Sequence, residues 1–198
     1  MKRTAQLAGL ILTIFMVPNV EATTLFQLAG SAIVEAVDEA PSFSLTIDGI
    51  TATLTANIGV LNTTAVSGFG VNAPGTGDET SLIDNVLGTE SVSIVFNVPV
   101  RLDQIVLSDF FGGAGDLALL TINGFAPGTL NPTAPALDVY NFASNNTVPI
   151  GQSIILAFQA GNGFSFDSFS VTAVPEPASG LLLLIGLAAI RVIHFRQA

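Results

Sequence analysis

The stretch SFSLTIDGITATLTANI, residues 42–58, decides the fold because apolar and polar residues alternate on both sides of a glycine. Alternation with a period of two places the apolar side chains on one face of a strand. Gly49 and Ile50 alone separate the runs 42–48 and 51–58, so the stretch predicts an antiparallel hairpin. The apolar members of the two runs are Phe43, Leu45, Ile47, Ala52, Leu54, Ala56 and Ile58.

The same alternation recurs along the chain between short turns. It predicts strands at residues 91–98, 102–110, 117–124, 153–160 and 164–171, and a shorter strand at 137–142 within a loop of residues 125–146. In the last long strand the alternation of apolar and polar residues shifts by one position at Asp167 and Ser168, which predicts a β-bulge. The predicted fold class is therefore all-β, an antiparallel β-sandwich of jelly-roll type spanning residues 23–173.

Charge separates this middle part of the chain from the two ends. Between Thr23 and Pro177, Arg101 is the single basic residue against 14 acids, a net charge of −13. Such a surface repels polyanions, which excludes nucleic acid as a partner. The same window contains neither His nor Cys, which excludes a Ser-His-Asp triad, a Cys nucleophile and a zinc site that uses His. We therefore expect the chain to have no enzymatic activity. The enzymatic alternative is a glycosidase that works with two carboxylates.

The N-terminus has the order of parts that marks a secretory signal. Lys2 and Arg3 precede the apolar run LAGLILTIFMV, residues 7–17, and NVEA follows with a small-residue site formed by Val20 and Ala22. A basic region, an apolar run of this length and a small-residue site predict a signal peptide of residues 1–22, cleaved after Ala22.

The C-terminus, VPEPASGLLLLIGLAAIRVIHFRQA, is a third segment, residues 174–198. It starts with Val174, Pro175, Glu176 and Pro177, which cannot continue a sheet. The apolar run 178–190 follows and predicts a short transmembrane helix, below the roughly 20 residues of a full span. Basic residues stay on the cytoplasmic side of a membrane. Because basic residues stand at both ends of the chain, the acidic domain between them is expected on the outer side of the membrane.

This tail resembles the PEP-CTERM sorting signal of exported bacterial proteins. The resemblance covers about the last 25 residues, and its basic end is more dilute than is usual in that family. It implies that exosortase, a membrane protease-transpeptidase, reads the signal. It also implies a precursor anchored in the inner membrane by the C-terminal helix, and later a place at the cell surface or in an extracellular matrix of exopolysaccharide or biofilm. The matching residues are Pro175, Glu176 and Pro177, then 181–190, then Arg191 and Arg196.

One loop offers candidate metal ligands. The sequence GTGDETSLID contains Asp78, Glu79 and Asp84, and Asp167 at the expected bulge supplies a fourth carboxylate. Calcium prefers several oxygen ligands on such a loop, so Ca²⁺ is the candidate ion, although no cofactor is expected to be required. The alternative is that these acids only keep the domain soluble.

The sequence does not decide between two functions for the domain, that of a surface or matrix protein and that of a binding module. The binding alternative is a calcium-dependent module for extracellular polysaccharide. Thr51, Thr53 and Thr55 on one strand face would suit an ice-binding surface, although a single such strand is ordinary β propensity. Phe110 and Phe111 precede two glycines and predict an exposed loop wedge.

Overall fold

The computed structural model describes residues 22–30, 37, 39–64, 66–75, 81–122, 128–133, 137–143 and 146–175. The predicted signal segment up to Glu21 and the predicted sorting segment from Glu176 onward, with its apolar run, lie outside these residues. Among the residues that are described, no helix has the length and apolar character needed to cross a membrane.

The described residues form two antiparallel sheets, which confirms the all-β fold class. Sheet A has the order β10-β7-β13-β5-β4, with β1 on β13 and β11 on β7, and sheet B has the order β2-β3-β6-β12-β8-β9. The strands of sheet A are β1 (Thr23–Gln27), β4 (Val60–Thr64), β5 (Gly68–Asn72), β7 (Val100–Ser108), β10 (Leu137–Asn141), β11 (Thr147–Val148) and β13 (Ser165–Ala173). Those of sheet B are β2 (Ser42–Ile47), β3 (Ile50–Ala56), β6 (Ser91–Phe96), β8 (Leu117–Ile122), β9 (Gly128–Leu130) and β12 (Ser153–Ala160).

The hairpin expected at residues 42–58 is present as β2 and β3. Its turn is Asp48 and Gly49, with Ile47 paired to Ile50, so it begins one residue earlier than predicted. Both turn residues have positive φ, 51° and 80°, as in the two-residue turn for which Asp-Gly is a preferred sequence. The earlier turn brings Ile50 into β3, where it is buried.

The core lies between the two sheets and is rich in phenylalanine. Phe169 of β13 stacks on Phe26 of β1, with ring centroids 4.8 Å apart, and meets Phe96 of β6 edge-on at 6.1 Å. The Phe96 contact joins sheet B to sheet A. A second inter-sheet contact pairs Phe43 of β2 with Phe69 of β5 at 6.0 Å. Packing between the sheets therefore replaces the disulfides that a chain without cysteine cannot form.

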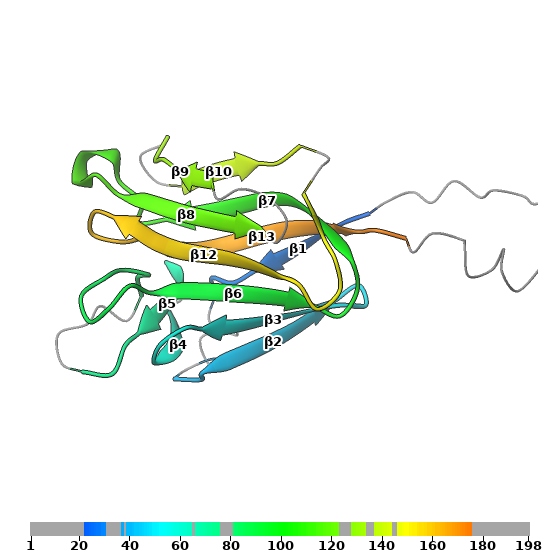
Figure 1. Cartoon of the computed structure of the whole chain (residues 1–198), viewed down its shortest axis with the longest axis horizontal. Coiled ribbons are helices and arrows are strands. Elements are labelled where there is room, and N and C mark those ends of the chain that lie inside the picture. The colour runs from blue at the N-terminus through cyan, green and yellow to red at the C-terminus, as the bar shows by residue number, and fades with distance from the viewer. Residues whose placement is uncertain are drawn as a thin grey trace, which may run out of the picture.

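The first and last strands of the domain leave it at the same end. β1 pairs with β13 so that Thr23 lies opposite Thr172, and their hydroxyl oxygens are 3.3 Å apart. Figure 1 shows β1 (blue) and the end of β13 (orange) on the same side of the sandwich. At the other end of β13, Ser165 lies opposite Ser108 of β7. β13 thus runs the length of the sandwich, about 30 Å for nine residues.

Candidate functional site

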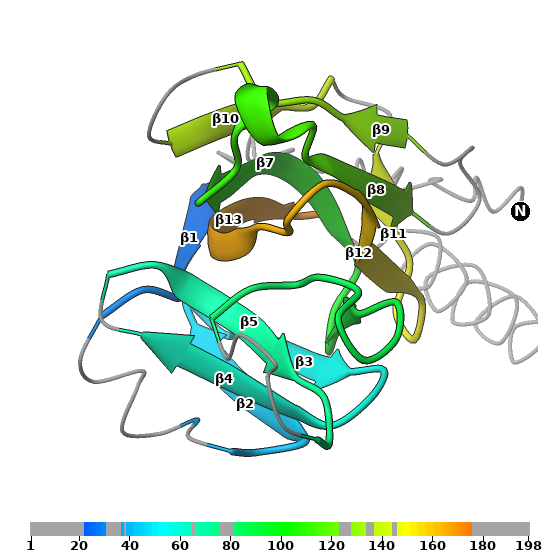
Figure 2. The same cartoon turned by 90° about the vertical axis from the view of Figure 1, so that its left-hand side faces the viewer.

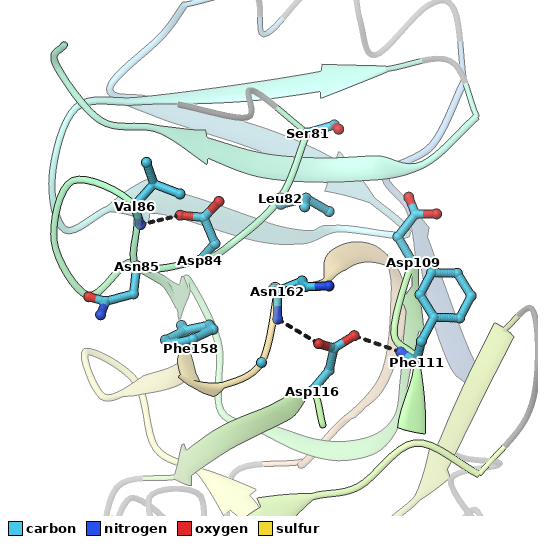
Figure 3. Close-up of a pocket in the computed structure, with 12 residues that line it drawn as sticks. Ser81, Leu82, Asp84, Asn85, Val86, Asp109, Phe111, Asp116, Phe158 and Asn162 are labelled. Atoms are coloured by element: carbon cyan, nitrogen blue, oxygen red, sulfur yellow. Dashed lines mark hydrogen bonds between the residues drawn. The ribbon is translucent and has the colours of Figure 1, made fainter. Parts of the chain in front are cut away.

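A cleft of about 810 Å³ opens at the end of the sandwich that is distant from Thr23 and Ala173. Three segments line it: residues 81–86 before β6, residues 109–116 between β7 and β8, and residues 158–163, which comprise the end of β12 and the turn that follows it. Figure 2 shows the sandwich from this end, and Figure 3 shows the lining side chains. Pockets of this size, with mixed apolar and polar walls, are the usual sites for small ligands.

Backbone pairing holds the first of these segments against the sheets. Ile83 and Phe164 form an isolated antiparallel bridge, with the Ile83 N–H donating to the Phe164 carbonyl at 2.7 Å. The Val71 N–H of β5 donates to the carbonyl of Leu82 at 2.8 Å. Residues that are far apart in the sequence therefore form one wall of the cleft.

Asp116 ties the other two segments together. Its carboxylate accepts a hydrogen bond from the Phe111 N–H at 2.8 Å and another from the Asn162 N–H at 2.7 Å, and the residue is 1 % exposed. A Cβ on Gly161 would lie 2.2 Å from Asp116 Oδ1, and the φ of +92° also favours glycine. Asp116 is thus a structural group of the cleft, and little of it is accessible to a ligand.

Asp84 also forms its hydrogen bonds within its own loop. Its Oδ1 accepts from the Val86 N–H at 2.8 Å, and its own N–H donates to Oε2 of Glu90 at 2.8 Å. The Glu90 N–H returns a bond to the carbonyl of Asp84 at 3.0 Å, and both acids are buried. These three bonds close the loop of residues 84–90, and the two that reach carboxylate oxygens compensate for burying those groups.

The accessible groups of the cleft are different residues. Asp109 is half-buried and has a left-handed backbone, φ 51°, which Asp tolerates better than most residues. Its Oδ2 accepts only a long bond, 3.4 Å, from the Ser165 hydroxyl among the contacts of the described residues. Phe111 is 47 % exposed at the rim, and the amides of Asn85 and Asn162 are exposed. An aromatic face, a carboxylate and two amides can stack on a ligand and exchange hydrogen bonds with it.

The predicted Phe110–Phe111 wedge is therefore half correct. Phe111 is exposed, whereas Phe110 turns inward, is 2 % exposed, and meets Phe164 edge-on at 5.6 Å. Adjacent residues in extended backbone point to opposite sides, so the pair divides between the core and the rim.

The four predicted calcium ligands have different outcomes. Asp78 and Glu79 lie outside the described residues. Asp84 lines the cleft, but Asp167 lies in the bulge of β13 and its Oδ1 accepts from the Gln27 amide at 3.2 Å. The register of β13 against β7 shifts between Phe166 and Ser168, which confirms the bulge. Among the described residues, no three acids or histidines form a group that could hold a metal ion.

The predicted processing residues lie at the domain's ends. Ala22 directly precedes β1, and Val174 and Pro175 directly follow β13. The Val174 N–H donates to the Pro99 carbonyl at 2.9 Å. Glu176, Pro177, Arg191 and Arg196 lie outside the described residues.

The chain matches no protein-family model, no curated protein and no solved structure.

Proposed function

We propose that the chain is an exported, non-enzymatic protein of the cell surface or extracellular matrix, sorted and anchored by residues 174–198. The observation that carries the proposal is that both ends of the domain leave it together, at Thr23 and Ala173, at the end opposite the cleft. Removal of a signal peptide after Ala22 would leave Thr23, the first residue of β1, as the new N-terminus. An anchor after β13 would then hold the sandwich upright, with the cleft facing away from the membrane.

The proposed domain is a sandwich of jelly-roll type. Its support is that the chain crosses repeatedly from one sheet to the other, at β1 to β2, β3 to β4, β5 to β6, β6 to β7, β7 to β8, β9 to β10, β11 to β12 and β12 to β13. Such crossings are characteristic of double-sheet β folds.

The sorting proposal predicts that the Pro-Glu-Pro motif decides where the protein ends up. In a bacterial host that carries an exosortase, we expect wild-type protein in the envelope or matrix fraction, with Thr23 as its N-terminal residue by mass spectrometry. A triple variant with alanine at Pro175, Glu176 and Pro177 should remain as unprocessed precursor in the inner membrane. Glu39→Ala, an acid-to-alanine change within the domain, should behave as wild type. Equal amounts of wild type and triple variant in the outer fraction would disprove the sorting role.

The cleft favours a second function on the same protein, binding of an extracellular polysaccharide. Phe111 offers a flat apolar surface to the C–H face of a sugar ring, and Asp109 and the exposed amides can bond its hydroxyls. The net charge of −10 favours neutral sugars over uronates because like charges repel. Calcium would bind through Asp78 and Glu79, the acids that precede the first cleft segment in the sequence, and would make this binding calcium-dependent.

Binding at the cleft predicts that Phe111→Ala abolishes retention on neutral polysaccharide in affinity electrophoresis. Leu137→Ala is the matched control, because Leu137 is also 47 % exposed but lies on β10 of sheet A. If calcium takes part, millimolar Ca²⁺ should raise the melting temperature of the wild type but not of the Asp78→Asn, Glu79→Gln double variant. Equal retention of both alanine variants would place the site elsewhere.

A further inference from the structure

The outward face of sheet B is free of charge. The six described strands of this sheet contain no Asp, Glu, Lys or Arg. The charged strand residues all belong to sheet A: Arg101, Asp103, Asp138 and Asp167. Soluble monomeric proteins usually intersperse charges over such a face, which prevents association. In a chain with a net charge of −10, an uncharged sheet face requires an explanation.

This face carries Ser and Thr hydroxyls, with a few apolar side chains among them. On β2 and β3, the Ser44 and Thr53 hydroxyls are 2.8 Å apart, as are those of Thr46 and Thr51. Further across the sheet Val95, which is 36 % exposed, lies between Thr53 of β3 and Ser153 of β12. Ile155 of β12 lies in the same way between Ser93 of β6 and Thr121 of β8. Hydroxyls that already pair with each other lose little when water is removed from them. The face is thus suited to being covered by an uncharged surface.

We propose that this face is where a second copy of the chain docks, face to face. Charge favours this occupant, because two copies brought together elsewhere would oppose the carboxylates of sheet A or those of the loops. Only the sheet B faces can meet without such an opposition among the described strands. The Ser and Thr hydroxyls can exchange hydrogen bonds, and the exposed side chain of Val95 supplies apolar contact.

The size of the face sets the strength of this association. Six strands about 4.8 Å apart and about 20 Å long give roughly 500 Å² per copy and about 1,000 Å² for the pair. Specific interfaces usually bury about 1,200–2,000 Å², so the dimer should be weak and transient. Figure 1 looks directly onto this face, which runs parallel to the direction in which β1 and β13 leave the domain. Two copies held at these ends on one surface could therefore meet side by side.

Sedimentation of the full chain in detergent tests the proposal, with Val95→Glu and Val139→Glu as a matched pair. Both residues are exposed valines on strands, 36 % and 46 % exposed, but Val139 lies on β10 of sheet A. Both variants gain the same charge and keep the same tail, so they differ only in the face that is altered. We expect dimers for wild type and Val139→Glu, and a dissociation constant raised about tenfold or more for Val95→Glu. Added salt should strengthen the wild-type dimer, since it screens the repulsion between acidic copies.

Three outcomes would overturn the proposal. A wild-type chain that stays monomeric up to about 1 mM has no such interface of measurable strength. Equal dissociation constants for the two glutamate variants would place the contact in the tail or on another face. A monomeric wild type that binds a neutral polysaccharide or ice through Val95 would assign the face to another occupant. None of these outcomes depends on the sorting signal, so the proposed export and anchoring would stand or fall separately.

Discussion

Replacing Phe169 with alanine is expected to lower the free energy of unfolding by about 3–5 kcal/mol. The side chain is fully buried and contacts three other rings, at centroid distances of 4.8 Å to Phe26, 5.6 Å to Phe166 and 6.1 Å to Phe96. Phe96 belongs to sheet B, so the substitution removes contacts between the sheets as well as within sheet A. The cavity that remains cannot close without moving one sheet against the other.

Urea unfolding of the purified chain measures this loss, with Phe111→Ala as control. Phe111 has the same side chain but is 47 % exposed at the rim of the cleft, so its truncation should change stability by no more than about 0.5 kcal/mol. The slope of free energy against urea should be equal in both variants, since both unfold the same surface. A loss for Phe169→Ala no larger than that for Phe111→Ala would contradict the central role of this ring.

The sequence predicted those parts of the fold whose alternation is long and unbroken. The alternation of apolar and polar residues predicts the hairpin of β2 and β3, the bounds of β12 and the bulge at Asp167. β4 was missed because its sequence, VLNTT, does not alternate. β5 was missed because Gly68 and Gly70 take alternate positions in GFGVN, where other backbone approaches them closely. A Cβ on Gly70 would lie 2.2 Å from the carbonyl carbon of Ser81, so the segment lining the cleft packs directly on β5.

The cleft could not be predicted in the same way. Asp109 and Asp116 flank a glycine-rich stretch that is visible in the sequence, but their roles depend on residues near position 163. The pairing of β12 with β8, in which Ala160 lies opposite Leu117, brings Asn162 to Asp116. The one available signal was an acid at each end of a tight turn, and it does not distinguish the buried carboxylate from the accessible one.

That distinction makes Asp116 the second substitution with a large expected effect. Asp116→Ala removes the charged acceptor of two backbone N–H groups, those of Phe111 and Asn162, and should cost about 3 kcal/mol of unfolding free energy. Asp116→Asn keeps one oxygen and should lose about half as much. Asp109→Asn removes an equal charge and keeps the left-handed backbone tolerable, so it should stay within about 0.5 kcal/mol of wild type.

Hydrogen exchange adds a local measurement to these stabilities. If Asp116 holds the two loops together, the Phe111 and Asn162 amides should exchange faster in Asp116→Asn than global destabilisation alone explains, because the loops open while the sheets stay folded. The amides of β12, such as that of Leu156, serve as the internal reference for global opening. Uniform acceleration of all these amides would mean that Asp116 stabilises the sandwich as a whole. The cleft would then be a rigid part of the core, and its loops could not close separately around a ligand.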